Sequence, residues 1–430
     1  MTTLIIIVAA IGFFALIMAS IALHEVGHLL PGKLFDVKIT QYFVGFGRTL
    51  WKVRRGETEY GIKMLPLGGY VRLIGMYPPS KVGDGIEHAG PVARFADSAR
   101  DVEYTDITEA DHGRLFYEKK TWQKVIIMAG GPAMNLLLAF LIFLGVNLIH
   151  GQYRPNLVVS SISDCAVPAA RASDPCEADD PISPAKAAGV KVGDRMVSFN
   201  GVTLTSWTQL SDLIRANGDG VATIVVEREG EEVALTPTHT IVTGVADRLD
   251  PSRIVSAGFL GVGPSYTLVK AGPIATASDM WTLSKQSAVA LASFPVKVWN
   301  VAADLVTGRE RNPNGPMSIV GASVAAGEIA GTDKLDVGEK VSSWFLLLGS
   351  VNLFVALLNL VPLLPLDGGH IAGALYEGAR RRLAILTRRP DPGPVDTARM
   401  LPVAYVVGGF LALSGLVLVL ADIISPITLF

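Results

Sequence analysis

The sequence contains few charged residues, and this restricts the classes of protein to which the chain can belong. Asp, Glu, Lys and Arg make up 18% of the 430 residues, whereas half of the residues are hydrophobic and the mean hydropathy is +0.41. A soluble enzyme of this length is less apolar, so the composition indicates a membrane protein. The net charge is −2 and the longest run of like charge is 380–382, which gives no indication of nucleic-acid binding.

The first apolar stretch lacks a cationic start and a small-residue cleavage site, the two features of a cleavable signal peptide. We therefore interpret it as a retained span. A bilayer crossing needs about 20 apolar residues, and four stretches are long enough: residues 3–30, 125–150, 344–366 and 401–423. Residues 274–306 are only intermittently apolar, and we expect them to lie along the outer face of the membrane.

Lys and Arg residues near the span ends predict the orientation of the chain. They gather between the first and second spans and again between the third and fourth, so both loops are expected in the cytoplasm. The N-terminus, residues 153–343 and the C-terminus are then outside.

The chain has two cysteines, Cys165 and Cys176, and both fall in the predicted outer region. An oxidising compartment would allow them to form a disulfide. The alternative is a pair of free thiols, and the spacing does not match a zinc knuckle.

The first span contains His24, Glu25 and His28 in an H-E-x-x-H pattern. On a helix, two histidines four residues apart share one face and reach a single metal ion, with the glutamate beside it. Ionisable residues are rare inside membrane spans and are usually functional. We therefore predict a zinc site with Glu25 as the catalytic base; the alternative is a pair of hydrogen-bonded core histidines.

Two histidines leave a tetrahedral zinc one protein ligand short, and catalysis also needs an open position for water. Asp367 is the acidic residue of a long apolar run that Pro362 and Pro365 interrupt. Such a broken helix is tolerated in a bilayer where protein or water surrounds it. We prefer Asp367 as the third ligand. His370 is the rival, and a capping role for Asp367 is the alternative.

Four motifs together resemble the site-two proteases, zinc metalloproteases that cut inside membranes. They are the H-E-x-x-H of the first span, G-G-P-x-x-N at 130–135, a PDZ-like module, and N-x-x-P-x-x-P-L-D-G at 359–368. The chain is most similar to the bacterial members with four spans and one PDZ domain. The resemblance covers nearly the whole chain and is weakest at about 78–111.

The resemblance implies an intramembrane endopeptidase with one zinc ion per chain in the bacterial cell membrane. It further implies substrates with a single span, such as anti-sigma factors, which are cut after another protease has removed their outer part. It also implies that Asn135 and Asn359 line the active site and hold the substrate backbone or the oxyanion. The alternative for each asparagine is an interhelical hydrogen bond.

Alternating apolar and polar residues with frequent glycines predict a β-hairpin in residues 33–77. The resemblance implies that this loop re-enters the membrane, where a strand edge could pair with an extended substrate. A cytoplasmic hairpin resting on the bilayer is the alternative.

S-P-A-x-x-A-G-V-x-x-G-D at 183–194 is typical of bacterial PDZ domains. The pattern around it predicts a strand, a turn at 200–201, a helix over 206–215 and a hairpin turning at 229–230. Because the cysteine-bearing insertion, 164–182, falls near the expected peptide-binding loop, peptide capture and a size filter over the active site both fit.

The predicted fold is an α-helical polytopic membrane protein with four spans, a membrane-re-entrant β-hairpin and an extracytoplasmic α+β PDZ-like domain. We expect contact with the lipid bilayer, and neither an organic cofactor nor nucleic acid. The rival functions are a membrane receptor or scaffold with a structural metal and an ion transporter, although a transporter would contain more intramembrane charges. The expected segments are 1–32 (first span), 33–77 (β-hairpin loop), 78–122 (cytoplasmic insertion), 123–151 (second span), 152–266 (PDZ domain), 267–342 (amphipathic outer-face segment), 343–374 (third span), 375–399 (cytoplasmic loop) and 400–424 (fourth span).

Overall fold

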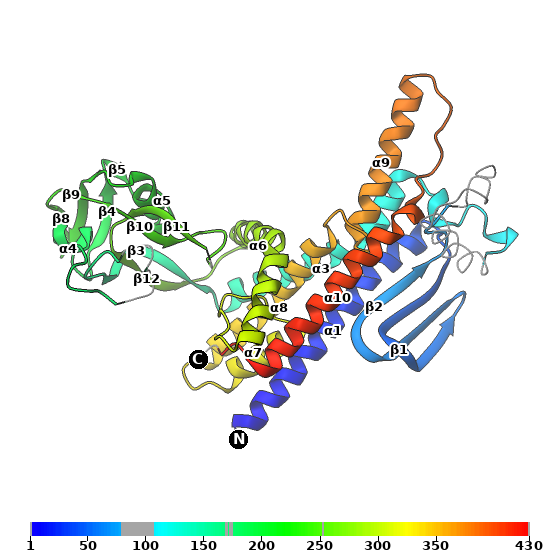
Figure 1. Ribbon diagram of the computed structural model, residues 1–430, viewed down its shortest axis with the longest axis horizontal. Coiled ribbons are helices and arrows are strands. Elements are labelled where there is room, and N and C mark those ends of the chain that lie inside the picture. Colours follow the sequence, from blue (N-terminus) through cyan, green and yellow to red (C-terminus); the bar gives the residue numbers. More distant parts are fainter. Residues whose placement is uncertain (1, 79–106, 168–170, 172–174, 252, 429–430) are drawn as a thin grey trace. The chain divides into compact units, whose positions relative to one another are not determined.

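The computed structural model describes residues 2–78, 107–167, 171, 175–251 and 253–428 (Figure 1). The chain divides into two compact units. Unit 1 contains Met1–Leu144 and Asp279–Phe430, and unit 2 contains Gly145–Ser278. Most of the predicted cytoplasmic insertion, at 79–106, lies outside the described residues.

Unit 1 consists mainly of helices, with one β-sheet near its start. Helix α3 continues into unit 2, and α6 leads the chain back. The elements are α1 (Thr2–Leu34), β1 (Ile39–Arg55), β2 (Thr58–Leu73), the 3-10 turns η2 (Glu109–Asp111) and η3 (Phe116–Glu118), α3 (Thr121–Ile149), α6 (Pro273–Thr307), α7 (Ile319–Gly331), α8 (Val337–Asn359), α9 (Asp367–Leu386), η5 (Thr397–Met400) and α10 (Leu401–Ile424).

Five helices in the described residues are long and apolar enough to cross a membrane, where the sequence predicted four. Helices α1, α3, α8 and α10 correspond to the predicted spans. The fifth is α6, which we expected to lie along the outer face. Its apolar residues are interrupted, yet one 18-residue window reaches a mean hydropathy of 1.4. The four-span count is therefore not confirmed.

Helix α7 is a short apolar helix that the sequence analysis did not separate from the amphipathic segment 267–342. It packs against α1, α8 and α10. Its sequence, IVGASVAAGEIAG, is rich in small residues, which allow close helix packing in a membrane. At the contact with α1, Ala322 and Ala326 are buried against Phe13 and Ile17.

The third predicted span is broken, as the prolines indicated. Helix α8 ends at Asn359, and α9 begins at Asp367 after a loop with a cis peptide bond between Leu364 and Pro365. The first part of the expected cytoplasmic loop, 375–399, is helical, because α9 continues to Leu386. Its sequence supports this helix, since Ala, Leu and Arg are all strong helix formers.

Strands β1 and β2 form an antiparallel sheet in which each strand contributes two paired segments. The first half of β1 pairs with β2 on both sides: Val44 lies opposite Gly69 on one side and Ile62 on the other. The second half of β1 then pairs with the first half of β2. The predicted hairpin is therefore four segments wide, with residues 49–55 at one edge and residues 69–73 at the other.

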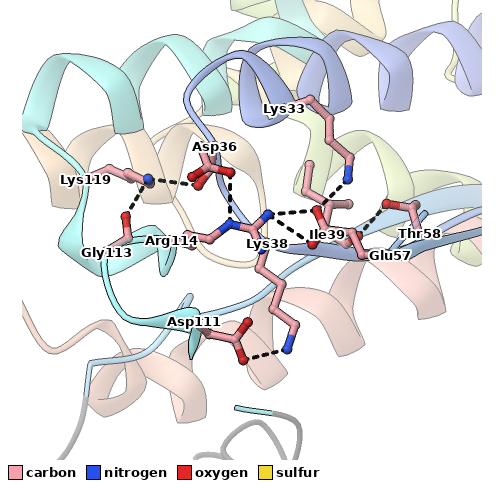
Figure 2. A network of polar contacts seen from close by, with 10 residues as sticks. All are labelled: Lys33, Asp36, Lys38, Ile39, Glu57, Thr58, Asp111, Gly113, Arg114 and Lys119. Atoms are coloured by element: carbon pink, nitrogen blue, oxygen red, sulfur yellow. Dashed lines mark hydrogen bonds and ion pairs between the residues drawn. The ribbon is translucent and has the colours of Figure 1, made fainter. Parts of the chain in front are cut away.

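A polar network joins the end of α1 to the β1–β2 turn and to the chain before α3 (Figure 2). Arg114 is its centre. Its guanidinium donates to Asp36 at 2.9 Å and to both carboxylate oxygens of Glu57 at 2.9 and 3.0 Å. Lys33 also donates to Glu57, at 2.8 Å, and Lys119 donates to the carbonyl oxygen of Asp36 at 2.9 Å. These bonds hold the β1–β2 turn beside the C-terminal end of α1.

Asp111 belongs to the same region and is buried. Lys38 Nζ lies 2.8 Å from its Oδ2, and the backbone N–H and hydroxyl of Thr108 donate to that oxygen at 2.7 and 2.6 Å. Burial favours the neutral carboxyl group, but the three donors outweigh it and lower the pKa of Asp111 to about 2.

Unit 2 is built on an antiparallel sheet with the strand order β12-β3-β4-β7-β8, and β5 pairs with β4. Side chains of β4 and β7 and of α5, among them Met196, Phe199, Leu210 and Ile224, form its core. The elements are β3 (Gln152–Ile162), α4 (Pro184–Ala188), β4 (Arg195–Phe199), β5 (Val202–Thr203), α5 (Trp207–Asn217), β6 (Val221–Ala222), β7 (Ile224–Arg228), β8 (Glu231–Ala234), β9 (Thr238–His239), β10 (Ile241–Ala246), β11 (Ile254–Phe259) and β12 (Val262–Val269).

The two turns predicted in unit 2 are present. Asn200 and Gly201 have positive φ angles, 50° and 77°, and so do Glu229 and Gly230, 55° and 90°. Two such residues in succession suit the tight turn between antiparallel strands. Ser206 caps α5 by accepting a hydrogen bond from the backbone N–H of Gln209, 3.2 Å away.

The structure joins Cys165 to Cys176 by a disulfide, with 6.0 Å between their Cα atoms. Part of the insertion that the bond closes, 168–170 and 172–174, lies outside the described residues.

The low pKa of Asp111 predicts a pH-dependent contribution to stability. An unfolded Asp has a pKa near 3.9, so the folded carboxylate stabilises unit 1 fully above about pH 4 and loses this effect as the pH falls through about 2. We expect Asp111→Asn to lower the free energy of unfolding at pH 7 by about 2 kcal/mol, since lowering a pKa by one unit corresponds to about 1.4 kcal/mol. Thermal unfolding of the detergent-solubilised protein between pH 7 and 2 measures this.

The difference from wild type should shrink below pH 4 and be only a small fraction of its pH 7 value at pH 2. Asp333→Asn, at an exposed aspartate, is the control and should change stability at neither pH. A loss for Asp111→Asn that is as large at pH 2 as at pH 7 would contradict the assignment.

Candidate metal centre

Helices α1 and α3 touch at glycines, and this contact brings α3 to the H-E-x-x-H motif. A Cβ atom on Gly27 would lie 2.3 Å from the carbonyl oxygen of Gly130, and one on Gly130 would lie 1.9 Å from the carbonyl oxygen of Gly27. Real side chains never approach so closely, so both positions need glycine. The two backbones can then pack in direct contact.

His24, His28 and Asp367 come together in unit 1. Oδ2 of Asp367 lies 3.3 Å from Nε2 of each histidine, and the two Nε2 atoms are 3.2 Å apart. Both histidines are buried, at 7% and 6% exposed. The first two residues come from one face of α1, as their spacing predicted, and the third comes from the first residue of α9.

This triangle fits a metal ion. Oδ2 of Asp367 is buried and accepts no hydrogen bond from the described residues. A carboxylate oxygen facing two imidazole nitrogens leaves three electron pairs directed at one point, which a cation would stabilise. Ligand atoms bound to tetrahedral zinc at about 2.0–2.1 Å lie about 3.3 Å from one another, which matches the observed sides. His370, the rival third ligand, is not part of this group.

The backbone of α3 fixes the tautomer of His28 and packs against both imidazoles. Nδ1 of His28 donates to the carbonyl oxygen of Ile127 at 2.8 Å, so its Nε2 carries the lone pair that faces the triangle. A Cβ atom on Gly131 would lie 2.2 Å from Nε2 of His28 and 2.6 Å from Nε2 of His24. The sequence does not predict either contact directly, because every residue has a backbone carbonyl group. The G-G-P motif was the one sequence feature that indicated close packing at this position.

Glu25 faces the same cavity. The cavity has a volume of about 680 Å³ and is lined by α1, by residues 68–73 of β2 and by the chain around Asp367. A Cβ atom on Gly69 would lie 3.0 Å from Cγ of Glu25, so the edge segment of the sheet lies against this carboxylate. The arrangement brings a carboxylate, a group of three candidate metal ligands and the strand segment 68–73 together in one cavity.

The other predicted site residues lie in different places. Asn359, the last residue of α8, lines the cavity, and so does His370. Asn135 is 1% exposed and does not line the cavity, and its Oδ1 has no hydrogen-bond partner within the described residues. Cys165 and Cys176 belong to unit 2.

The chain is similar to known proteins over most of its length. The model of peptidase family M50 matches residues 12–388, a range that includes the triad and Glu25. The zinc metalloprotease Rip1 of Mycobacterium tuberculosis (strain ATCC 25618 / H37Rv) is 34% identical over 435 residues, which cover 98% of this chain and 99% of that protein.

Two further relatives extend the similarity. Rip1 of Mycolicibacterium smegmatis is 31% identical over 97% of this chain and 98% of its own length. The zinc metalloprotease RasP of Geobacillus kaustophilus is 25% identical over 86% of this chain and 89% of its own length.

The close contact at Gly131 predicts a sensitive position. Gly131→Ala should displace the imidazoles and lower the zinc content of the purified protein at least tenfold, although Ala favours a helix over Gly by about 0.5–1 kcal/mol. Gly145→Ala on the same helix is the matched control, since its Cβ would meet nothing within 4 Å. Metal analysis of both variants tests this, and normal zinc content in Gly131→Ala would contradict the packing described.

Proposed function

The chain belongs to peptidase family M50, whose zinc metalloproteases cut proteins inside membranes, and on this premise we propose which of its residues carry the reaction. The protein is a zinc metalloendopeptidase with several helices able to span a membrane. One zinc ion per chain is held by His24, His28 and Asp367. The observation that carries this assignment is the triangle of electron-pair donors with sides of 3.2–3.3 Å.

Glu25 is the general base in this proposal. A zinc ion in this position would activate water and polarise the scissile carbonyl group. Glu25 follows His24 directly on α1 and faces the same cavity, so its carboxylate takes the proton of the attacking water. It then delivers that proton to the leaving amine.

The substrate is an extended segment that pairs with the edge of the sheet. Residues 69–73 pair with β1 on one side, and residues 68–73 line the cavity beside Glu25. A transmembrane helix must unwind before its carbonyl groups become accessible, and a strand edge would hold the unwound chain by backbone hydrogen bonds. Asn359, at the cavity wall, is the side chain that we assign to the substrate backbone or oxyanion, whereas the buried Asn135 does not line the cavity.

The substrates are single-span regulatory proteins, such as anti-sigma factors, cut after a first protease has removed their outer part. The distribution of basic residues supports a cell-membrane location with both termini and unit 2 outside. In this proposal unit 2 is a PDZ-like domain that restricts access by size. Its support is the S-P-A-x-x-A-G-V-x-x-G-D motif with the strand, helix and hairpin that follow it.

A scaffold with a structural metal would bind zinc equally well. Glu25 distinguishes the two functions, because a structural zinc site needs no base.

Replacing the base should separate catalysis from metal binding. We expect Glu25→Gln to keep one zinc ion per chain and to lower the cleavage rate of a trimmed single-span substrate at least a hundredfold, the lower range for a general base. Asp367→Asn is the companion variant and should lose both zinc and cleavage. A Glu25→Gln protein that cleaves at the wild-type rate, or a wild type that binds zinc yet cleaves no candidate substrate, would favour the scaffold.

The gating role of unit 2 predicts a change in substrate requirement. Deleting residues 157–264 should allow the protease to cut an untrimmed substrate that wild type leaves intact. Cleavage of both substrate forms is measured by gel assay, and the trimmed form controls for intact activity. Continued dependence on trimming in an active deletion variant would exclude the gate.

A further inference from the structure

Lys124 and Glu377 form a buried ion pair between α3 and α9. Lys124 Nζ lies 2.9 Å from both carboxylate oxygens, and each side chain is 4% exposed. The backbone N–H of Val395 donates to Oε2 of Glu377 at 3.2 Å, and Arg381 lies 3.3 Å from Oε1. Neither Lys124 nor Glu377 belongs to the triad or to the acid–base chemistry proposed above.

On one side, the pair is anchored to the helix that holds the imidazoles. Lys124, Ile127 and Gly131 follow one another at spacings of three and four residues, so they share a face of α3. The second accepts the hydrogen bond of His28, and the third packs against both imidazoles. The position of Lys124 is therefore fixed relative to the two histidines.

On the other side, the pair is anchored to the helix that begins with the aspartate. Glu377 lies ten residues after Asp367 on α9, about 15 Å along the helix axis. An α-helix transmits axial displacement with little change in length, so movement at Glu377 moves Asp367 as well. The loop between α8 and α9, residues 360–366, is not helical, so α8 does not set this position through a continuous helix.

Burying two charges is costly, and well-packed apolar residues often stabilise a fold as well as an ion pair does. Apolar contacts, however, are not directional, so they do not fix the position of one helix along the axis of another. A lysine that bonds both oxygens of one carboxylate sets the axial position of α9 relative to α3. We propose that Lys124 and Glu377 are positioning residues that set the axial position of α9 and thereby place Asp367 against His24 and His28. The inference rests on the ligand assignment proposed above.

The chain offers a matched control for general stability. Arg311 and Asp422 form another buried ion pair in unit 1, with side chains 4% and 1% exposed. Asp422 also accepts a hydrogen bond from the backbone N–H of Ser318 at 2.7 Å, next to the start of α7. Neither residue lines the cavity. Breaking this pair tests what the loss of a buried ion pair does by itself.

The experiment compares Glu377→Ala with Asp422→Ala in the full-length protein in detergent. Zinc affinity is measured by competition with a chelator, and ligand geometry by the visible absorption of the Co²⁺-substituted protein. We expect Glu377→Ala to weaken zinc binding at least tenfold and to change the Co²⁺ spectrum, as loss of a supporting contact does in metal sites. Asp422→Ala should lower the melting temperature without changing either readout. Equal effects of the two variants on zinc affinity, or none in Glu377→Ala, would overturn the proposal.

A double variant covers the case in which Glu377→Ala fails to fold. Lys124→Met with Glu377→Leu removes both charges and retains packing, so it should restore the melting temperature while zinc binding stays weak. Wild-type zinc affinity in that variant would overturn the proposal. His24→Ala separates the two levels of inference. If it binds zinc like wild type, the ligand assignment itself fails; if it loses zinc while Glu377→Ala does not, only the positioning role fails.

Discussion

The contact between α1 and α3 at Gly27 and Gly130 is the constraint on which the rest of the site depends. Backbone meets backbone there, so the carbonyl oxygen of Ile127 can reach Nδ1 of His28. A methyl group at either glycine would separate the helices and remove that acceptor. Without it, the imidazole would be free to change its tautomer and to rotate. The proposed metal site therefore depends on α3, although α3 contributes none of the three proposed ligands.

Local patterns predicted the parts of the molecule in which function needs an unusual residue. Two histidines, a glutamate and Asp367 in apolar surroundings are costly unless they are used, so they stand out in the sequence itself. The turns at 200–201 and 229–230 are equally recognisable, because asparagine and glycine suit positive φ angles. In each case a single short stretch of sequence carries the information.

Other features depend on partners distant in sequence and could not be predicted in this way. The role of Ile127 lies in its backbone, and α7 has 13 residues, too few to indicate a span. The double pairing of β1 and β2 depends on bends within the strands, which alternation of apolar and polar residues does not reveal. The arginines of α9 look alike in the sequence, although Arg381 lies against a buried ion pair. Each of these features is defined by a neighbouring element that no local pattern identifies.

The distance in sequence between the proposed ligands has a consequence for the timing of synthesis. Asp367 follows His24 by 343 residues and is therefore translated well after both histidines. At about 5–20 residues per second, a ribosome needs roughly 20–70 s to cover that interval. The nascent chain therefore carries an incomplete triad while its first helices enter the membrane. The proposed zinc site is therefore completed only after α9 has been synthesised, later than the helix that carries both histidines.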